Sequence, residues 1–255
     1  MSDRFDSMGA YKKRFDAVLA YIETHLEGDL SVEALSGVAN FSRFHFHRQF
    51  AAYVGVPVAR YVQSRIQARV WRDAERISTT SELANMECDF CCPLSLRSFT
   101  MQVRIVDFSE VRVAALEHCG PTELVNESVR KFVEWRKQSG QSPVAASRTF
   151  GIPRNNPDMT PDVAFRFDIC GEIAEPVASN LYGIHELVIP GGRCAVVRHG
   201  GSLDHISETI YPIYRDWLPT SGEELRDHPL FFHYLSVFPE TPHDQWETDI
   251  YIPLL

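Results

Sequence analysis

The sequence predicts a two-domain α+β protein, with an all-helical domain over residues 1–101 and a duplicated α+β domain over residues 102–255. Three observations lead to this prediction. Residues 30–61 read as two short helices joined by a tight turn, a strand-like alternation begins at Val103, and the remainder repeats its own pattern once. With 255 residues, 44% of them hydrophobic, the chain is long enough for two separate cores.

The first helix pair has clear boundary signals. Ser31 is a good N-cap, Asn40 stands in the turn where a left-handed backbone is tolerated, and Ser42 is placed to cap the second helix. One stripe of the second helix is expected to face the first helix through Leu35 and Val38. The residues of that stripe are Phe46, Phe50 and Tyr53.

The opposite side of the second helix predicts a nucleic-acid interface. At 100° per residue, Phe44, His47 and Arg48 cluster on the outward face, and Arg43 lies at its rim near the helix N-terminus. Helix-turn-helix units use this part of the second helix to contact base edges and phosphates. We therefore predict that these four residues bind DNA. The alternative is a helical hairpin in which Arg48 and His47 are merely solvated.

The run S-x-[aromatic]-x-[apolar]-x-R-x-F, here Ser42, Phe44, Phe46, Arg48 and Phe50, resembles the first DNA-binding subdomain of AraC/XylS transcription regulators. In that family, residues 54–70 would be a turn and a long linking helix. The second half of the family pattern is damaged, because residues 89–90 replace the expected Gly-Phe and the closing helix is missing. Losing those phosphate contacts should weaken DNA binding.

Charge divides unequally along the chain. Residues 1–105 carry 13 Lys+Arg and 12 Asp+Glu, and the remaining residues carry 12 and 22, which together give the net charge of −9. A DNA-binding protein can be acidic overall if its negative part faces away from the DNA. The linking helix carries a row of arginines that is either a phosphate-binding ribbon or an ordinary solvated stripe. The row comprises Arg65, Arg69, Arg72 and Arg76.

Several classes of protein are disfavoured. A signal peptide and a long apolar span are both missing, so we expect a cytoplasmic protein without membrane contacts. The six cysteines read as reduced thiols, and the cluster Cys88, Cys91 and Cys92 lacks a second ligand pair. No metal, no cofactor and no catalytic residue are predicted, since no phosphate loop or hydrolase motif is visible.

The region after residue 102 repeats itself. Residues 111–140 align with residues 192–222, which pairs His118 with His199, and residues 156–173 align with residues 238–255, which pairs Asp168 with Asp249. Each copy reads as a strand, a glycine turn, an amphipathic helix, a loop and further strands. This pattern predicts a pseudo-twofold α+β domain, in which both histidines belong to turns and are structural.

The repeated region resembles the GyrI-like domain, through an H-x-G motif near the start of each copy and the run D-I-Y-I-P-L at residues 249–254. The resemblance implies a cleft between the two halves that binds hydrophobic, often cationic compounds, frequently with an acidic residue on the last strand. The chain departs from the family where Pro-Tyr often follows the H-x-G glycine. Here Pro121-Thr122 and Ser202-Leu203 follow it.

Strand alternation selects the candidate effector-binding residues. Glu247, Asp249 and Tyr251 point to one side of the last strand, and Asp168 takes the same position in the matching strand. Carboxylates and aromatic rings suit a lipophilic cation, and Tyr234 is a further aromatic candidate. The alternative is that Asp168 pairs with Arg166 or another arginine, and that Glu247 and Asp249 lie on a wet sheet face.

We therefore expect a ligand-responsive transcription regulator that binds double-stranded DNA and a small hydrophobic or cationic effector, with RNA polymerase as a further candidate partner. Two alternatives stay open. One is a protein that sequesters a small molecule and has impaired DNA binding, and the other is a GyrI-like hydrolase that uses Glu247 and Asp249.

Overall fold

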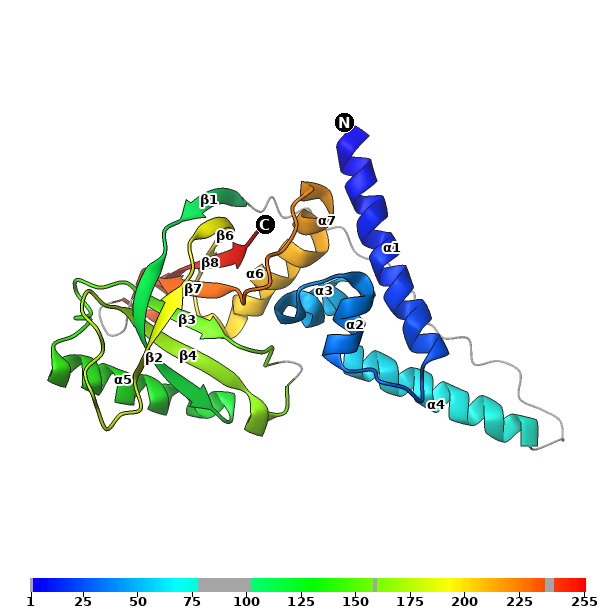
Figure 1. The fold of residues 1–255 in the computed structure, drawn as a ribbon, viewed down its shortest axis with the longest axis horizontal. Helices are drawn as coiled ribbons and strands as arrows, with labels where there is room; N and C mark the ends of the chain where they lie inside the picture. The colour runs from blue at the N-terminus through cyan, green and yellow to red at the C-terminus, as the bar shows by residue number, and fades with distance from the viewer. Residues whose placement is uncertain (1, 78–101, 158–159, 237–240) are drawn as a thin grey trace.

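The computed structural model describes residues 2–77, 102–157, 160–236 and 241–255. The damaged second helix-turn-helix unit and the cysteines at positions 88, 91 and 92 lie outside the described residues. The N-terminal part is helical, as predicted (Figure 1). Its helices are α1 (Ser2–Thr24), α2 (Val32–Ala39), α3 (Arg43–Val54) and α4 (Val58–Ile77).

The predicted helix boundaries in this part are observed. The Ser31 hydroxyl accepts a hydrogen bond from the Ala34 N–H at 3.3 Å, and Asn40 ends α2 in the left-handed conformation with φ 51°. Ser42 stands at the N-cap of α3 but makes no side-chain cap hydrogen bond, and its hydroxyl donates to Asp227 at 3.0 Å. The turn residue of the N-terminal part is thus already engaged by the C-terminal part.

The helical core has the predicted stripe, with one correction. Phe46 and Phe50 are fully buried against Leu35 and Phe15. Val38 was expected to share that contact, yet it is 37% exposed. The long helix α1 occupies the side of α2 that carries Leu35 and leaves Val38 outside.

The C-terminal part is built on one eight-stranded antiparallel sheet, in the order β1-β6-β8-β7-β3-β4-β2-β5. The strands are β1 (Arg104–Phe108), β2 (Val111–Cys119), β3 (Thr149–Pro153), β4 (Arg166–Glu172), β5 (His185–Ile189), β6 (Gly192–Gly200), β7 (Phe231–Tyr234) and β8 (Glu247–Pro253). Its helical elements are η1 (Thr122–Leu124), α5 (Val125–Ser139), η2 (Asp162–Ala164), η3 (Leu203–His205), α6 (Ile206–Pro212), η4 (Ile213–Trp217), α7 (Leu218–Ser221) and η5 (His243–Gln245).

The sheet has two similar halves that meet where β3 pairs with β7. Reading outward, one half contains β3, β4 and β2 with α5, and the other contains β7, β8 and β6 with α6, η4 and α7. The outermost strands are exchanged, since β1 pairs with β6 and β5 pairs with β2. The strand order therefore reads the same from either end. That this symmetry arose by duplication stays a prediction from the sequence repeat.

Each face of the sheet carries a buried apolar cluster. On the helix face, Ile250 and Ile252 pack with Tyr214 and Leu218 of the second half, and α5 covers the first half. On the other face, which we call the aromatic face, side chains of both halves pack together. Its aromatic residues include Phe108, Phe150, Phe231 and Tyr251.

The helical part is docked on the second half of this sheet (Figure 1). Helix α3 contacts α6 and η4, and α1 contacts α7. Ala52 of α3 belongs to the same core as Ile210, Tyr214 and Leu218. The interface therefore includes apolar packing as well as polar contacts.

Candidate functional site

A buried histidine joins the predicted DNA-reading helix to the C-terminal part. His45 of α3 is fully buried, with Nδ1 2.8 Å from the Tyr214 hydroxyl and Nε2 2.9 Å from the His228 carbonyl oxygen. A carbonyl only accepts, so Nε2 carries the proton and Tyr214 donates to Nδ1. Burial, followed by the nearby Arg48 charge, lowers the pKa of His45 to about 3. The imidazole is neutral, and both of its nitrogens are satisfied across the interface.

Arg48 requires a correction. The helical periodicity placed it on the outward face of α3, but its side chain is only 5% exposed. The reason is tertiary, because α6 and η4 pack on the side of α3 that carries His45, Arg48 and Ala52. Arg48 lies close enough to Tyr214 to oppose the burial effect that raises the pKa of that phenol. In this arrangement Arg48 is covered by the C-terminal part.

The other three predicted DNA-binding residues are less buried than Arg48. Arg43 is exposed, with its guanidinium 4.8 Å from the centre of the Phe44 ring and its Nε 3.9 Å from Asp227 Oδ2. Phe44 and His47 are half-buried, and burial is the largest cause that lowers the pKa of His47. The predicted reading face is therefore split, with Arg48 separated from its neighbours.

The arginine row on α4 is engaged by acidic residues near α1. Arg65 pairs with Glu23, and Arg69 pairs with Glu27 at 3.1 Å. The side chains of Arg72 and Arg76 lie outside the described ones. For Arg65 and Arg69, the structure matches the alternative of a surface stripe with local partners.

The candidate effector carboxylates are each held by an arginine. Asp168 is buried, and Arg154 Nε donates to its Oδ2 at 2.6 Å. Burial raises the pKa of the Asp168 carboxyl above its ordinary value, against the opposing attraction of Arg154. The alternative that Asp168 pairs with an arginine is confirmed, with Arg154 rather than Arg166 as its partner.

The second carboxylate pair shares one arginine. Arg198 Nη2 donates to Asp249 Oδ2 at 3.1 Å, and Nη1 donates to Glu247 Oε2 at 3.0 Å. Arg104 adds a weaker contact to Asp249 at 3.8 Å. Asp249 is buried and Glu247 is 54% exposed. A cationic effector at Asp249 would therefore have to compete with two guanidinium groups of the protein.

The two candidate tyrosines lie on opposite faces of the sheet. Tyr251 lies on the aromatic face and stacks on Phe231, with ring centres 4.9 Å apart and planes at 6°. Tyr234 was grouped with it, but packs on the helix face with Phe167 and Phe232. Side chains alternate along β7, so Tyr234 faces away from Phe231. Tyr234 is thus separated from the carboxylates by the sheet itself.

Sequence reasoning missed a histidine on the aromatic face. His233 of β7 pairs in register with Asp249 of β8, and its ring centre lies 5.0 Å from that of Phe150. Burial is the largest cause that lowers its pKa. Side-chain alternation along β7 was the available signal, because it places His233 on the same face as Phe231. His233, Asp249 and Tyr251 therefore lie on the same face.

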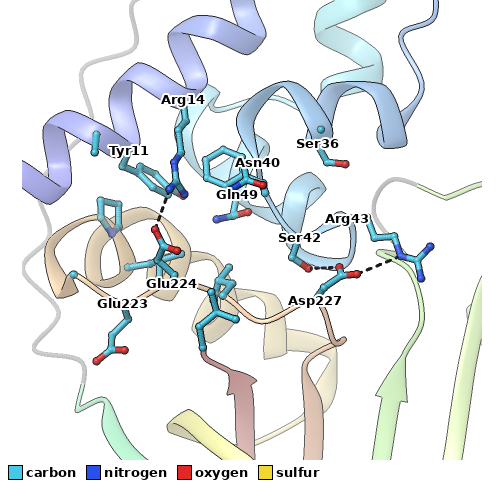
Figure 2. A pocket seen from close by; sticks show the side chains of 18 of the residues that line it. Tyr11, Arg14, Ser36, Asn40, Ser42, Arg43, Gln49, Glu223, Glu224 and Asp227 are labelled. Carbon is cyan, nitrogen blue, oxygen red and sulfur yellow. Dashed lines mark hydrogen bonds and ion pairs between the residues drawn. The ribbon is translucent and has the colours of Figure 1, made fainter.

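A cavity of about 550 Å³ lies between the helical part and the C-terminal part (Figure 2). One wall comes from α1, α2 and the start of α3, and the other from α7 and the segment after it. Polar contacts cross its edge: Arg14 Nη2 lies 2.9 Å from Glu224 Oε1, the Ser42 hydroxyl donates to Asp227, and Arg43 forms an ion pair with the same carboxylate. No local sequence signal could reveal it, because its walls are distant in the chain.

The repeated histidines have structural partners. His118 Nδ1 lies 2.9 Å from Ser128 Oγ, and His199 Nδ1 lies 2.8 Å from Thr209 Oγ1. Each imidazole thereby ties the end of a strand to the helix that follows. Among the described residues, the acidic, histidine and cysteine side chains form no cluster that could hold a metal ion. The helices of the described residues include none with the length and apolarity to span a membrane.

The fold places this chain among α+β proteins in which two similar halves share one curved antiparallel sheet with helices on one face. Residues 101–255 match the model of the GyrI-like small molecule binding domain. This match covers more than half of the chain, which therefore belongs to the GyrI-like family.

Three known proteins extend this comparison. The chain is 48% identical over 160 residues to "Probable transcriptional regulator YgiV" of Escherichia coli (strain K12), covering 62% of this chain and 99% of that protein. It is 42% identical over 55 residues to "Uncharacterized HTH-type transcriptional regulator YbfP" of Bacillus subtilis (strain 168), covering 22% of this chain and 19% of that protein. The structure of an EcmrR-DNA complex shares its fold with TM-score 0.50 and 14% identity, over 75% of this chain and 64% of that one.

Proposed function

We propose that this protein is a ligand-responsive transcription regulator. In this proposal, an AraC-type helix-turn-helix unit formed by α2 and α3 binds double-stranded DNA, and the GyrI-like part binds a small hydrophobic or cationic effector. RNA polymerase is a further partner. Two relatives named as transcriptional regulators and the similar fold seen in the EcmrR-DNA complex support the proposal.

The observation that carries the proposal is the direct packing of α3 on α6 and η4. Arg48 is the residue expected to contact a base edge, yet it is buried by the domain expected to bind the effector. DNA can bind only an arrangement in which Arg48 is uncovered. An effector that binds the covered and uncovered arrangements unequally would therefore control DNA binding.

The same burial favours a second function, that of a protein that sequesters a small molecule and whose helical part no longer reads DNA. The two functions differ in whether α3 can leave α6 and η4. Contacts at the edge of the interface allow a test, because Ser42 and Arg43 are both held by the exposed Asp227.

The test is to reverse that charge. Asp227→Lys replaces an attraction for Arg43 by a repulsion and removes the acceptor of the Ser42 hydroxyl. Loss of such exposed contacts should cost the covered arrangement about 1 kcal/mol, which corresponds to about fivefold tighter DNA binding. Binding is measured by fluorescence anisotropy with duplexes enriched by DNA selection. Glu123→Lys makes the same change of charge on η1, on the other half of the sheet, and is the matched control.

Arg48→Ala in the Asp227→Lys background completes the test. If Arg48 reads a base, this substitution should abolish the preference for the selected sequence and leave weaker, salt-dependent binding. Failure of the whole chain and of Asp227→Lys to enrich any duplex would contradict the regulator and favour sequestration.

A further inference from the structure

Two polar atoms in the cavity between the two parts have no hydrogen-bond partner among the described residues. They are the Tyr11 hydroxyl of α1 and Gln49 Oε1 of α3. The Gln49 side chain is only 2% exposed. Gln49 lies close enough to the Tyr11 hydroxyl to lower the pKa of Tyr11 as a hydrogen-bonding neighbour, against the larger effect of burial, but the pair does not reach standard hydrogen-bond geometry. Both side chains line the cavity (Figure 2). Buried polar atoms without partners are rare, so this pair calls for an explanation, and a bound molecule is one.

The two atoms require one donor and one acceptor. Burial raises the pKa of Tyr11, so its hydroxyl keeps its proton and can donate. Gln49 Oε1 can only accept. A hydroxyl group of a bound molecule can do both at once, by accepting from Tyr11 and donating to Gln49.

Apart from Glu33, the charged side chains that line the cavity are paired within the protein, Arg43 with Asp227 among them. Arg14 pairs with Glu224 at 2.9 Å, and Asp227 accepts from Ser42. Glu223 pairs with Arg193 at 2.9 Å. The unmet requirement is therefore for a neutral group rather than for an ion. The rest of the lining includes an apolar surface for the body of such a molecule, formed by Phe41, Leu218, Pro219 and Leu225.

We propose that this cavity binds a small neutral molecule that carries a hydroxyl group on an apolar body, of the alcohol or phenol class, with the hydroxyl bridging Tyr11 and Gln49. This site is separate from the sheet faces of the GyrI-like part. Its occupant touches α1 and α3 on one side and α7 on the other, so it stabilises the arrangement in which Arg48 is buried. This consequence for DNA binding rests on the proposed function.

Binding is tested with the full chain and 4-ethylphenol, by isothermal titration calorimetry without DNA. Ethylbenzene and 4-ethylbenzylamine are the comparison probes. Ethylbenzene lacks the hydroxyl, and 4-ethylbenzylamine carries a cationic ammonium group in its place. We expect 4-ethylphenol to bind at least fivefold more tightly than either. Such selectivity requires that both protein atoms pair with the hydroxyl.

Tyr11→Phe removes one partner and keeps the ring. It should weaken 4-ethylphenol binding at least fivefold, and without probe its Tm should stay unchanged or rise by about 2–4 °C, because a buried unpaired hydroxyl is lost. Tyr53→Phe is the matched control, since Tyr53 stacks on Phe15 with ring centres 4.4 Å apart and does not line the cavity. It should leave binding of 4-ethylphenol unchanged.

Other results would overturn the proposal. Equal binding of 4-ethylphenol and ethylbenzene, or equal binding in Tyr11→Phe and Tyr53→Phe, would mean that water satisfies these atoms. Stronger binding of 4-ethylbenzylamine would overturn the neutral class of ligand. If 4-ethylphenol binds as expected but the chain and Asp227→Lys bind no duplex, the cavity site stands and the proposed regulator fails.

Discussion

At the scale of single residues, carboxylates on the aromatic face are held by arginines. Alternation along the last strand correctly placed Glu247, Asp249 and Tyr251 on one side, because this pattern is local. The partners of the carboxylates could not be predicted in the same way. Arg198 reaches Asp249 from β6, and only the pairing of β6 with β8 makes them neighbours.

Asp249→Asn should destabilise the fold more than Glu247→Gln. Asp249 is buried and accepts from Arg198, whereas Glu247 is exposed and shares the same arginine. Removing one member of a buried pair costs several kcal/mol. Arg198, however, remains partly exposed to solvent and still pairs with Glu247, so we expect Asp249→Asn to lower the free energy of unfolding by about 2 kcal/mol. For Glu247→Gln we expect less than about 1 kcal/mol. Urea unfolding measures both changes, and equal losses would contradict the difference in burial.

At the scale of elements, α3 shows where prediction from a sequence ends. Phe46 and Phe50 were predicted correctly because their partner Leu35 lies on the adjacent helix. The burial of Arg48 was missed because α6 and η4, which cover it, come much later in the chain. The same limit explains Tyr234, whose face was fixed by the register of β7 against β3 and β8.

The close approach of β3 to Tyr234 gives an element-scale prediction. A Cβ at Gly151 would lie 2.4 Å from the Tyr234 hydroxyl and 2.5 Å from a Phe167 ring atom, and both rings pack in the core. Gly151→Ala should therefore destabilise the protein by about 1–3 kcal/mol. Gly9→Ala is the control, since Gly9 lies within α1 with open space around it. That change should stabilise the protein by up to about 1 kcal/mol, and a similar result for Gly151 would contradict the packing.

At the scale of the whole molecule, the two parts are joined by a neutral histidine. His45 has its pKa lowered to about 3 by burial, compared with 6.5 when it is exposed in an open or unfolded chain. The open chain therefore binds a proton that the covered arrangement excludes. Stability of the covered arrangement is complete above pH 6.5 and falls as the pH decreases toward 3.

Lowering the pH from 7.5 to 5.5 should therefore reduce the stability of the covered arrangement by about 1.4 kcal/mol. His45→Gln keeps a donor for the His228 carbonyl and an acceptor for Tyr214, but cannot titrate. It should reduce the pH dependence of urea unfolding by about that amount. His205→Gln changes an exposed histidine of η3 and serves as control. An unchanged pH dependence in His45→Gln would show that the interface is already open.

The exchanged edge strands have a consequence for synthesis on the ribosome. β1 leaves the ribosome early, but its partner β6 follows only after the entire first half. The outer edge of β2 likewise waits for β5, so a half-made sheet exposes unpaired backbone at that edge. We infer that neither repeat completes its part of the sheet alone during translation, because β1 and β2 of the first repeat pair with β6 and β5, which are made later.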